Sequence, residues 1–454
     1  MSQNPETDKV KDALDFLDKF TNYERMARYP YTASAMNLER VSRILAAVGS
    51  PEKKLAAIHI AGTKGKGSIA KMVSMILSSA GYRVGLYTSP HLVWKNERIQ
   101  VNEDMISDPD LARAIDALRP GVEAVQAQKE SGEVSYFELL TAAAFYHFAE
   151  RKVNYAVLET GLGGRLDATN VCAPSVVVIT PISLDHTDIL GDTIAKIALE
   201  KAMVIKPGAK VVVAPQAEAA QEVIAKRGRE MNAELFAVEK IYSWKLNYIY
   251  SHEMCFDLTG KRSLAGLKTK MVGPRQMSNA ASAILACDIL SGQGAKISDD
   301  TIRYGMARAR LAARFQTAEL LGRTLILDGA HNPESAQALM ETLGMVYPGK
   351  EYNFIVGLGQ DKDLAGFLAE LKPQAKTMAL CQAHHPRAAS VELLRSKLGD
   401  FNGRVVMEPE LKSVLENLSG LTKPGSIIII TGSFFLIGEA LQWLLPRGIE
   451  IQIP

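Results

Sequence analysis

Short apolar runs alternate with longer segments of helical period along most of the chain. Five runs in the first half are rich in Val, Ile and Ala and are bounded by turn-forming Gly, Ser or Pro: residues 56–61, 83–88, 155–159, 176–180 and 210–214. Such runs are typical of buried parallel strands, and the segments between them predict helices on both faces of a sheet. The pattern therefore predicts an N-terminal α/β domain.

The pattern changes over residues 235–271, where aromatic and polar residues alternate around Gly260 and Gly266. This alternation predicts antiparallel strands, so we expect a small antiparallel lobe attached to the first domain. Residues 276–290 and 302–312 then have the pattern of helices.

A second series of strands separated by helix-length segments follows a change of period near Arg314 and Gly322. The predicted strands are residues 324–327, 353–357, 377–380, 405–407 and 426–431, and they indicate a second, Rossmann-like α/β domain. We expect an N-terminal P-loop-type domain at 1–311, a hinge at 312–322 and the second domain at 323–454. Because parallel sheets bind ligands beyond the carboxyl ends of their strands, we expect the active site between the domains.

The composition narrows the classes of partner. The length of 454 residues fits two domains, and 52 Lys and Arg nearly balance 50 Asp and Glu, so we expect neither a nucleic-acid nor a membrane partner. The longest aliphatic run, residues 427–430, is too short to cross a bilayer, and the first 19 residues are too polar for a secretory signal. The four Cys have no zinc or disulfide spacing. We expect a cytoplasmic monomer, since no association motif is visible.

Residues 58–68, IHIAGTKGKGS, place a Gly- and Lys-rich turn between a predicted strand and a helix predicted to start near Ser68. Backbone N–H groups of such a turn, with the helix N-terminus, form a phosphate site. We expect ATP there, with Lys66 on its β and γ phosphates and Mg²⁺ at the Ser68 hydroxyl. The loop departs from G-x-x-x-x-G-K-[ST] at Ile60 and Gly67, and a basic surface turn is the alternative interpretation. The predicted nucleotide-binding residues here are Thr63, Gly65, Lys66, Gly67 and Ser68.

Three further predicted strands are followed by possible ligands for Mg²⁺: TSPH at 88–91, ETGLGGR at 159–165 and LDHTD at 184–188. Phosphoryl transfer depends on charge neutralisation, so such ligands are expected near a phosphate loop. Each segment alone is also explained as a turn or a helix cap. Together, at the same edge of one sheet, they favour a metal site.

These motifs together resemble the folylpolyglutamate synthase and bacterial dihydrofolate synthase family, within the Mur ligase superfamily. The resemblance covers nearly the whole chain and also rests on NLER at 37–40, SYFE at 135–138, LDATN at 166–170, EK at 200–201 and DGAHNP at 328–333. It implies that Ser89, Glu159 and His186 bind Mg²⁺, with two ions in the site. It also implies that Lys201 is carbamylated and helps to hold the second ion.

The resemblance implies the remaining site residues as well. Further nucleotide contacts are expected from Asn279, Arg314 and Asp328, and the catalytic residues are expected to be Lys66, Lys201, Asp328 and His331. The substrate-binding residues are expected to be Arg40, Ser135, Phe137, Leu166, Asp167 and Ala168. The chain departs from the family at Lys64, which replaces an Asn, and at Ala312-Ala313, which replaces Pro-Gly.

The implied reaction is the ATP-dependent addition of L-glutamate to a folate, by polyglutamylation of tetrahydrofolate, by conversion of dihydropteroate to dihydrofolate, or by both. The γ-phosphate is expected to activate a carboxylate as an acyl phosphate, which the glutamate amine attacks with release of phosphate and ADP. Two alternatives are another Mur-type amino-acid ligase and a P-loop nucleotide switch without ligase activity. A folate substrate is favoured over that of another Mur-type ligase by the motifs SYFE, TSPH and residues 166–168. A nucleotide switch is disfavoured by the paired metal motifs and DGAHNP, which it would not require.

Overall fold

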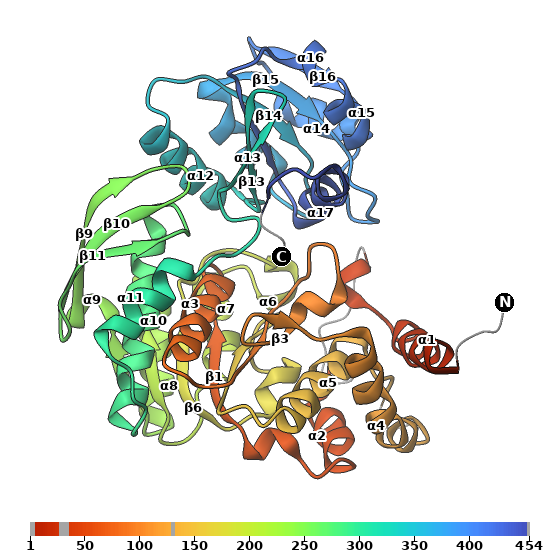
Figure 1. Cartoon of the computed structure of the whole chain (residues 1–454), viewed down its shortest axis with the longest axis vertical. Coiled ribbons are helices and arrows are strands. Elements are labelled where there is room, and N and C mark those ends of the chain that lie inside the picture. Colours follow the sequence, from red (N-terminus) through yellow and green to blue (C-terminus); the bar gives the residue numbers. More distant parts are fainter. Residues whose placement is uncertain (1–4, 27–35, 129–131, 452–454) are drawn as a thin grey trace.

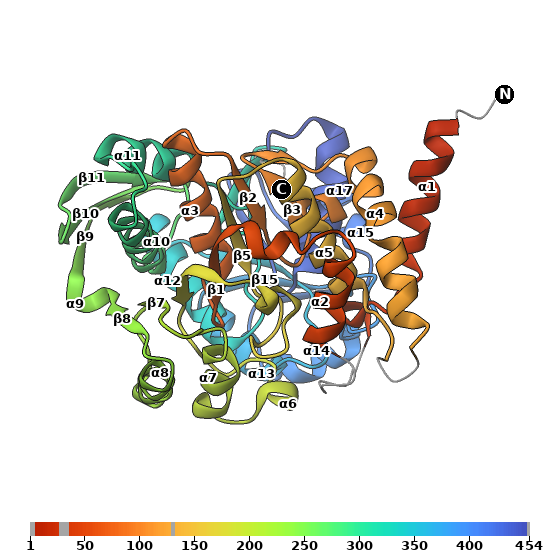
Figure 2. The same cartoon turned by 90° about the horizontal axis from the view of Figure 1, so that it is seen from below.

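The structure is a computed structural model that describes residues 5–26, 36–128 and 132–451. Two α/β units lie one above the other in Figure 1, the N-terminal unit below and the C-terminal unit above, with a small sheet at one side. Figure 2 shows α1 (Pro5–Asp18) beside α4 (Asp108–Gln126) at the edge opposite that small sheet.

The N-terminal unit is built on an eight-stranded sheet in the order β4-β3-β2-β5-β1-β6-β7-β8. Its strands are β1 (Ala56–Ala61), β2 (Val84–Tyr87), β3 (Ile99–Val101), β4 (Asp104–Met105), β5 (Tyr155–Glu159), β6 (Pro174–Ile179), β7 (Lys210–Val213) and β8 (Glu234–Ala237). All pair in parallel except β3 and β4, which form an antiparallel edge. β1 lies between β5 and β6, so strands that come later in the sequence flank it on both sides. The loop after β1 therefore leaves the sheet at a topological switch point, the place where open α/β sheets bind ligands.

Helices cover both faces of this sheet. Ile58 and Ile60 of β1 pack with α3 and α10 on one face, whereas Ala57 packs with α2, α4 and α5 on the other. Alternate residues of a strand point to opposite faces, so the apolar run of β1 supplies both cores. The other helices of the unit are α2 (Leu38–Ala46), α3 (Lys66–Ser79), α5 (Tyr136–Glu150), α6 (Thr187–Leu190), α7 (Ile194–Ala202), α8 (Glu218–Glu230), α9 (Val238–Ile241), α10 (Arg275–Gly292) and α11 (Asp299–Arg308).

The predicted antiparallel lobe is confirmed, with one correction at its start. Strands β9 (Tyr242–Ile249), β10 (Met254–Gly260) and β11 (Leu264–Thr269) form a three-stranded antiparallel sheet in the order β11-β10-β9. Leu235, expected in this lobe, instead lies in β8, which pairs in parallel with β7 at the edge of the large sheet. The helix expected at 302–312 is α11, which ends at Arg308.

The C-terminal unit has a six-stranded sheet in the order β12-β13-β17-β14-β15-β16. Its strands are β12 (Gln316–Leu320), β13 (Arg323–Asp328), β14 (Tyr352–Val356), β15 (Ala375–Leu380), β16 (Arg404–Met407) and β17 (Ile427–Thr431), and its helices are α12 (Pro333–Val346), α13 (Leu364–Leu371), α14 (Val391–Leu398), α15 (Leu411–Glu416), α16 (Leu418–Leu421) and α17 (Phe434–Leu444). The aliphatic run at 427–430 is the buried centre of this sheet. β12 is antiparallel to β13 and lies inside the segment expected to be a hinge.

Among the helices that the structure describes, none combines the length and apolar character needed to span a membrane. The four Cys side chains are free and buried.

Candidate active site

A cavity of about 780 Å³ lies between the two units, at the carboxyl ends of their parallel strands. Loops after β1, β5 and β6 line it from the N-terminal unit, and loops after β13, β14 and β17 line it from the C-terminal unit. The structure brings together the predicted residues Thr63, Gly65, Lys66, Gly67, Ser68, Ser89, Ser135, Phe137, Glu159, Leu166, Asp167, Ala168, His186, Lys201, Asn279, Arg314, Asp328 and His331. Of the predicted site residues, Arg40 is outside this lining.

The phosphate loop is held in a tight turn between β1 and α3. The amides of Thr63 and Lys64 donate to the carbonyl of Pro181, at 3.0 and 3.1 Å, and α3 starts at Lys66, two residues before the predicted start. Gly65 has φ of 86°, and a Cβ there would lie 2.5 Å from Oδ1 of Asn279, so both backbone and space require glycine. Since the first amides of a helix have no intrahelical acceptor, the loop presents donors and a partial positive charge to an anion.

Glu159 lies at the end of β5 beside this loop. The amide of Ser89 donates to Oε2 of Glu159 at 3.3 Å, and the Glu159 side chain is buried. Burial raises the pKa of Glu159, and the nearby Lys66 charge opposes that rise. A cation would therefore relieve the desolvation of this carboxylate.

The donor set around Glu159 is suited to Mg²⁺ bound together with phosphate. In the described part of the chain, no three His, Cys, Asp or Glu side chains lie close enough to hold a metal ion by themselves. Mg²⁺ is usually held by one or two carboxylates together with water and substrate phosphate oxygens. One buried carboxylate, the Ser89 hydroxyl and an adjacent phosphate loop match that requirement.

Burial lowers the pKa of two nitrogen-bearing side chains that line the same cavity. Burial lowers the pKa of His186 to about 3, which leaves a neutral imidazole, the form that binds metals. Burial, with a contribution from Lys66, lowers the pKa of Lys201 to about 7. The Nζ atom of Lys201 donates to the carbonyl of Gly62 at 2.7 Å, so this lysine lies directly under the phosphate loop.

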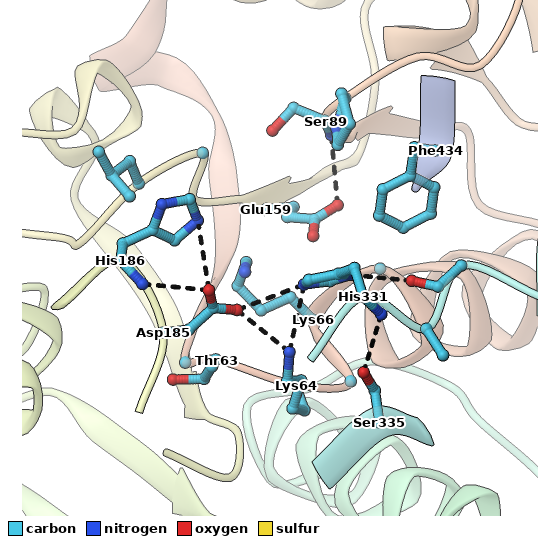
Figure 3. Close-up of a pocket in the computed structure, with 18 of the residues that line it drawn as sticks. Thr63, Lys64, Lys66, Ser89, Glu159, Asp185, His186, His331, Ser335 and Phe434 are labelled. Atoms are coloured by element: carbon cyan, nitrogen blue, oxygen red, sulfur yellow. Dashed lines mark hydrogen bonds and ion pairs between the residues drawn. The ribbon is translucent and has the colours of Figure 1, made fainter. Parts of the chain in front are cut away.

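Asp185 is a residue that the sequence interpretation passed over in favour of its neighbour His186. Figure 3 shows its carboxylate with His186 on one side, and with Lys64 of the phosphate loop and His331 of the C-terminal unit on the other. Asp185 oxygens lie 3.1 Å from Lys64 Nζ and 2.9 Å from Nζ of Lys362, which follows β14. Burial would raise the pKa of Asp185, but His331 and Lys64 more than offset it, and the pKa lies far below its usual value. This carboxylate therefore links the two units through ion pairs.

His331 has an assigned tautomer in this arrangement. Its Nδ1–H donates to the carbonyl of Gly329 at 2.8 Å, and its Nε2 lies 3.3 Å from Nζ of Lys64. Burial, reinforced by the Lys64 charge, lowers the pKa of His331. Nε2 also lies 3.4 Å from Oδ2 of Asp185. The lone pair of the neutral ring is thus on Nε2, where it faces the Lys64 ammonium inside the cavity.

Asp328 closes the nucleotide side of the cavity. Its carboxylate accepts hydrogen bonds of 2.9 Å from the amides of Phe315 and Ala330, and burial raises its pKa while the Arg314 charge opposes the rise. The Arg314 guanidinium lies 5.1 Å from the centre of the Phe434 ring. Asp328 thus fixes the connection between the two units as well as facing the cavity.

The opposite wall carries the residues expected to bind the acceptor. Ser135 is the N-cap of α5 and forms a capping box with Glu138, which places Phe137 on the first turn at the cavity. Both carboxylate oxygens of Asp167 already accept hydrogen bonds from backbone amides. Its Oδ2 accepts the amides of Gly161 and Leu162 at 2.8 and 3.0 Å, and its Oδ1 accepts the amide of Thr169 at 3.1 Å. We interpret Asp167 as the residue that shapes this wall.

Arg40, expected to bind substrate, lies behind the wall. Its side chain is buried, and its Nη2 donates to Oε1 of Glu138 at 2.6 Å while Nε donates at 3.1 Å. The guanidinium therefore neutralises and orients Glu138, which does line the cavity. The sequence could not show this, because the two residues are 98 positions apart.

Replacing Arg40 by alanine is expected to lower the free energy of unfolding by about 3–5 kcal/mol, because Glu138 is left as an unpaired buried charge. Urea denaturation measures the loss. Arg43→Ala, on the more exposed side of the same helix, is the control and should cost less than about 1 kcal/mol. If the Arg40→Ala protein has normal stability and only its KM for the acceptor rises, the result would support a substrate-binding role for Arg40.

Comparison with known proteins gives the same two units. A family described as the Mur ligase middle domain matches residues 60–287, and one described as the Mur ligase glutamate ligase domain matches residues 313–434. The Bacillus subtilis dihydrofolate synthase/folylpolyglutamate synthase is 34% identical over 413 residues, which cover 88% of this chain and 93% of that protein.

Solved structures extend the likeness to the whole fold. The folylpolyglutamate synthase of Mycobacterium tuberculosis, complexed with ADP and AMPPCP, has a TM-score of 0.86 and 30% identity, covering 96% of this chain and 98% of the other. An Escherichia coli FolC structure in complex with DHPP and ADP has a TM-score of 0.82 and 28% identity, with coverage of 96% and 98%.

Proposed function

Because this chain belongs to the folylpolyglutamate synthase and dihydrofolate synthase family, which is built from Mur ligase domains, we propose specific roles for the residues of its cavity. The chain is an ATP-dependent ligase that adds glutamate to a folate. The observation that carries the assignment of roles is the cavity itself, which joins the phosphate loop of one unit to Asp328 and His331 of the other.

The first step we propose is transfer of the ATP γ-phosphate to a carboxylate of the acceptor. Amides at the start of α3 and the Lys66 ammonium hold the phosphates, while Asn279, Arg314 and Asp328 hold the rest of the nucleotide. Ser89, Glu159 and His186 would hold Mg²⁺, as two ions in the family's manner of binding, and the bound metal would supply charge neutralisation for the transfer. The acceptor carboxylate becomes an acyl phosphate, and ADP is the product.

The second step is attack of the glutamate nitrogen on the acyl carbon. The ammonium form must lose a proton to attack, and we propose that the neutral Nε2 of His331 accepts it. The C–N bond then forms to give a tetrahedral intermediate, which expels phosphate as the C–O bond breaks. The second proton of the nitrogen leaves with the phosphate. We propose that the two units, which line the cavity from opposite sides, close over the bound substrates and exclude water that would otherwise hydrolyse the acyl phosphate.

Lys201 is proposed to be carbamylated and to help hold the second Mg²⁺. Carbamylation requires an unprotonated amine, and burial lowers the pKa of Lys201 to about 7, far below that of an exposed lysine. The product is a carboxylate, which suits Mg²⁺ better than an amine does.

The domain limits 1–311, 312–322 and 323–454 are also a proposal. The second half of the predicted hinge differs from the structure, because β12 (Gln316–Leu320) is a strand of the C-terminal sheet. We therefore propose that the connection between the units lies between the end of α11 at Arg308 and the start of β12 at Gln316. We propose further that the ligase acts as a cytoplasmic monomer, and a formal charge of +2 over 454 residues is in keeping with small-molecule substrates alone.

Purified protein supplied with ATP, Mg²⁺ and glutamate should release ADP only when an acceptor is present. Dihydropteroate and tetrahydrofolate are compared as acceptors, and the one that supports turnover decides between dihydrofolate synthesis and polyglutamylation, or shows both. Release of AMP and pyrophosphate would contradict the acyl-phosphate mechanism.

A further inference from the structure

The loop that carries Ser89 is held rigidly by one buried carboxylate. The amides of Leu92, Val93 and Trp94 donate to the side chain of Glu97 at 2.7, 2.7 and 2.5 Å. Glu97 is buried in the first turn after the loop. Three charge-assisted hydrogen bonds to one carboxylate hold residues 92–94 together. The preceding residue is held as well, because Nε of Arg98 donates to Nδ1 of His91 at 2.8 Å.

This loop contacts α17 of the C-terminal unit. A Cβ on Gly438 would lie 2.2 Å from the carbonyl oxygen of Leu92 and 3.2 Å from its carbonyl carbon. The side chains of Leu92 and Val93 pack against the apolar cluster to which the buried face of α17 belongs. A glycine inside a helix is unfavourable for that helix, so the close approach of the Leu92 backbone accounts for it.

The same loop is connected to the proposed metal ligands. Ser89 is three residues before Leu92, and its amide donates to Glu159 at 3.3 Å. The first turn of α17 lines the cavity with Phe434 and Phe435. The helix thus contacts both the cavity and the loop that bears a metal ligand.

We propose that the seating of Leu92 on Gly438 couples the position of the C-terminal unit to the position of Ser89. Gly438 is then a positioning residue for the ligase reaction. It acts through the rigid loop, because a packed contact between backbones transmits a displacement instead of absorbing it. The proposal rests on the proposed function, since it takes Ser89 as a ligand of Mg²⁺.

The variant Gly438→Ala tests this contact, and Gly344→Ala is its matched control. Both glycines lie within helices of the C-terminal unit, and a Cβ on Gly344 would meet nothing within 4 Å. Both variants gain helix propensity, so Gly344→Ala should melt at or above the wild-type temperature. In Gly438→Ala this gain is opposed by the displacement of Leu92 and Val93 from the cluster on which they pack. Only Gly438→Ala should push the two units apart.

Three measurements separate the variants. In small-angle scattering with ADP and Mg²⁺, Gly438→Ala should have a larger radius of gyration than the wild type and Gly344→Ala. Its half-saturating Mg²⁺ concentration for tight ADP binding should rise, and its kcat should fall by roughly ten- to a hundredfold, as expected for a small misplacement of a reacting group. Gly344→Ala should match the wild type in all three.

Wild-type scattering and wild-type Mg²⁺ dependence in Gly438→Ala would overturn the proposal, whatever its kcat. The scattering and ADP-binding measurements need no turnover. Failure of the wild type to ligate glutamate would therefore refute the proposed function separately.

Discussion

Replacing Lys66 by methionine is expected to lower glutamate-dependent ADP release by roughly a thousandfold, the scale on which a preorganised charge acts on phosphoryl transfer. Lys66 is the first residue of α3 and lies in the cavity where the phosphates are proposed to bind. Methionine keeps the length and the packing of the stem but removes the charge. Single-turnover rates at saturating ATP measure the loss at the chemical step.

Lys64→Asn is the matched control from the same loop. Lys64 is already paired with Asp185, and Lys362 pairs with the other oxygen of that carboxylate, so the loss of one partner leaves Asp185 neutralised. Asparagine is also the residue that the family usually has there. We expect a change within about tenfold. If Lys66→Met and Lys64→Asn lose activity equally, the reaction depends on the total positive charge of the loop and not on Lys66 in particular.

The buried parallel strands could be predicted from the sequence because each supplies apolar residues to both faces of a sheet. β1 and β5 have the predicted bounds. Edge strands are half exposed and short, so their residues have no continuous apolar pattern. β4 and β12 were missed for this reason, and β8 was assigned to the wrong sheet. β3 is buried but has only three residues, too few for a pattern to be recognised.

The gathering of the phosphate loop, Ser89, Glu159 and His186 around one cavity could be predicted because each follows a strand in a compact motif. The contacts that link the two units could not be predicted from the sequence. Asp185 is 121 residues from Lys64 and 177 from Lys362, and neither separation has a pattern in sequence. The need for glycine at position 438 could not be predicted either, because it depends on the Leu92 backbone that packs against it. Contacts of this kind depend on how the two units pack together, and the local pattern of apolar and polar residues carries no information about them.

Replacing Lys201 by alanine is expected to lower kcat by at least about a hundredfold, because one proposed ligand of the second Mg²⁺ is lost. Lys201→Glu should retain part of the activity, since it restores a carboxylate on a shorter stem. Lys206→Ala is the control. Burial also lowers the pKa of Lys206, but that lysine donates to the carbonyl of Asn170 and does not line the cavity. Activity close to wild type in Lys201→Ala would contradict the carbamate.

The carbamate itself can be observed without turnover, by carbon-13 NMR of protein in labelled bicarbonate. Only the unprotonated amine reacts with CO₂, so the signal should grow as pH rises through about 7, the lowered pKa of Lys201, and should be lost at lower pH. The Lys66 charge contributes to that lowering. Lys66→Met should therefore raise the pKa of Lys201 and move the growth of the signal to higher pH. A signal at the same pH in both proteins would mean that burial alone sets the reactivity of this lysine.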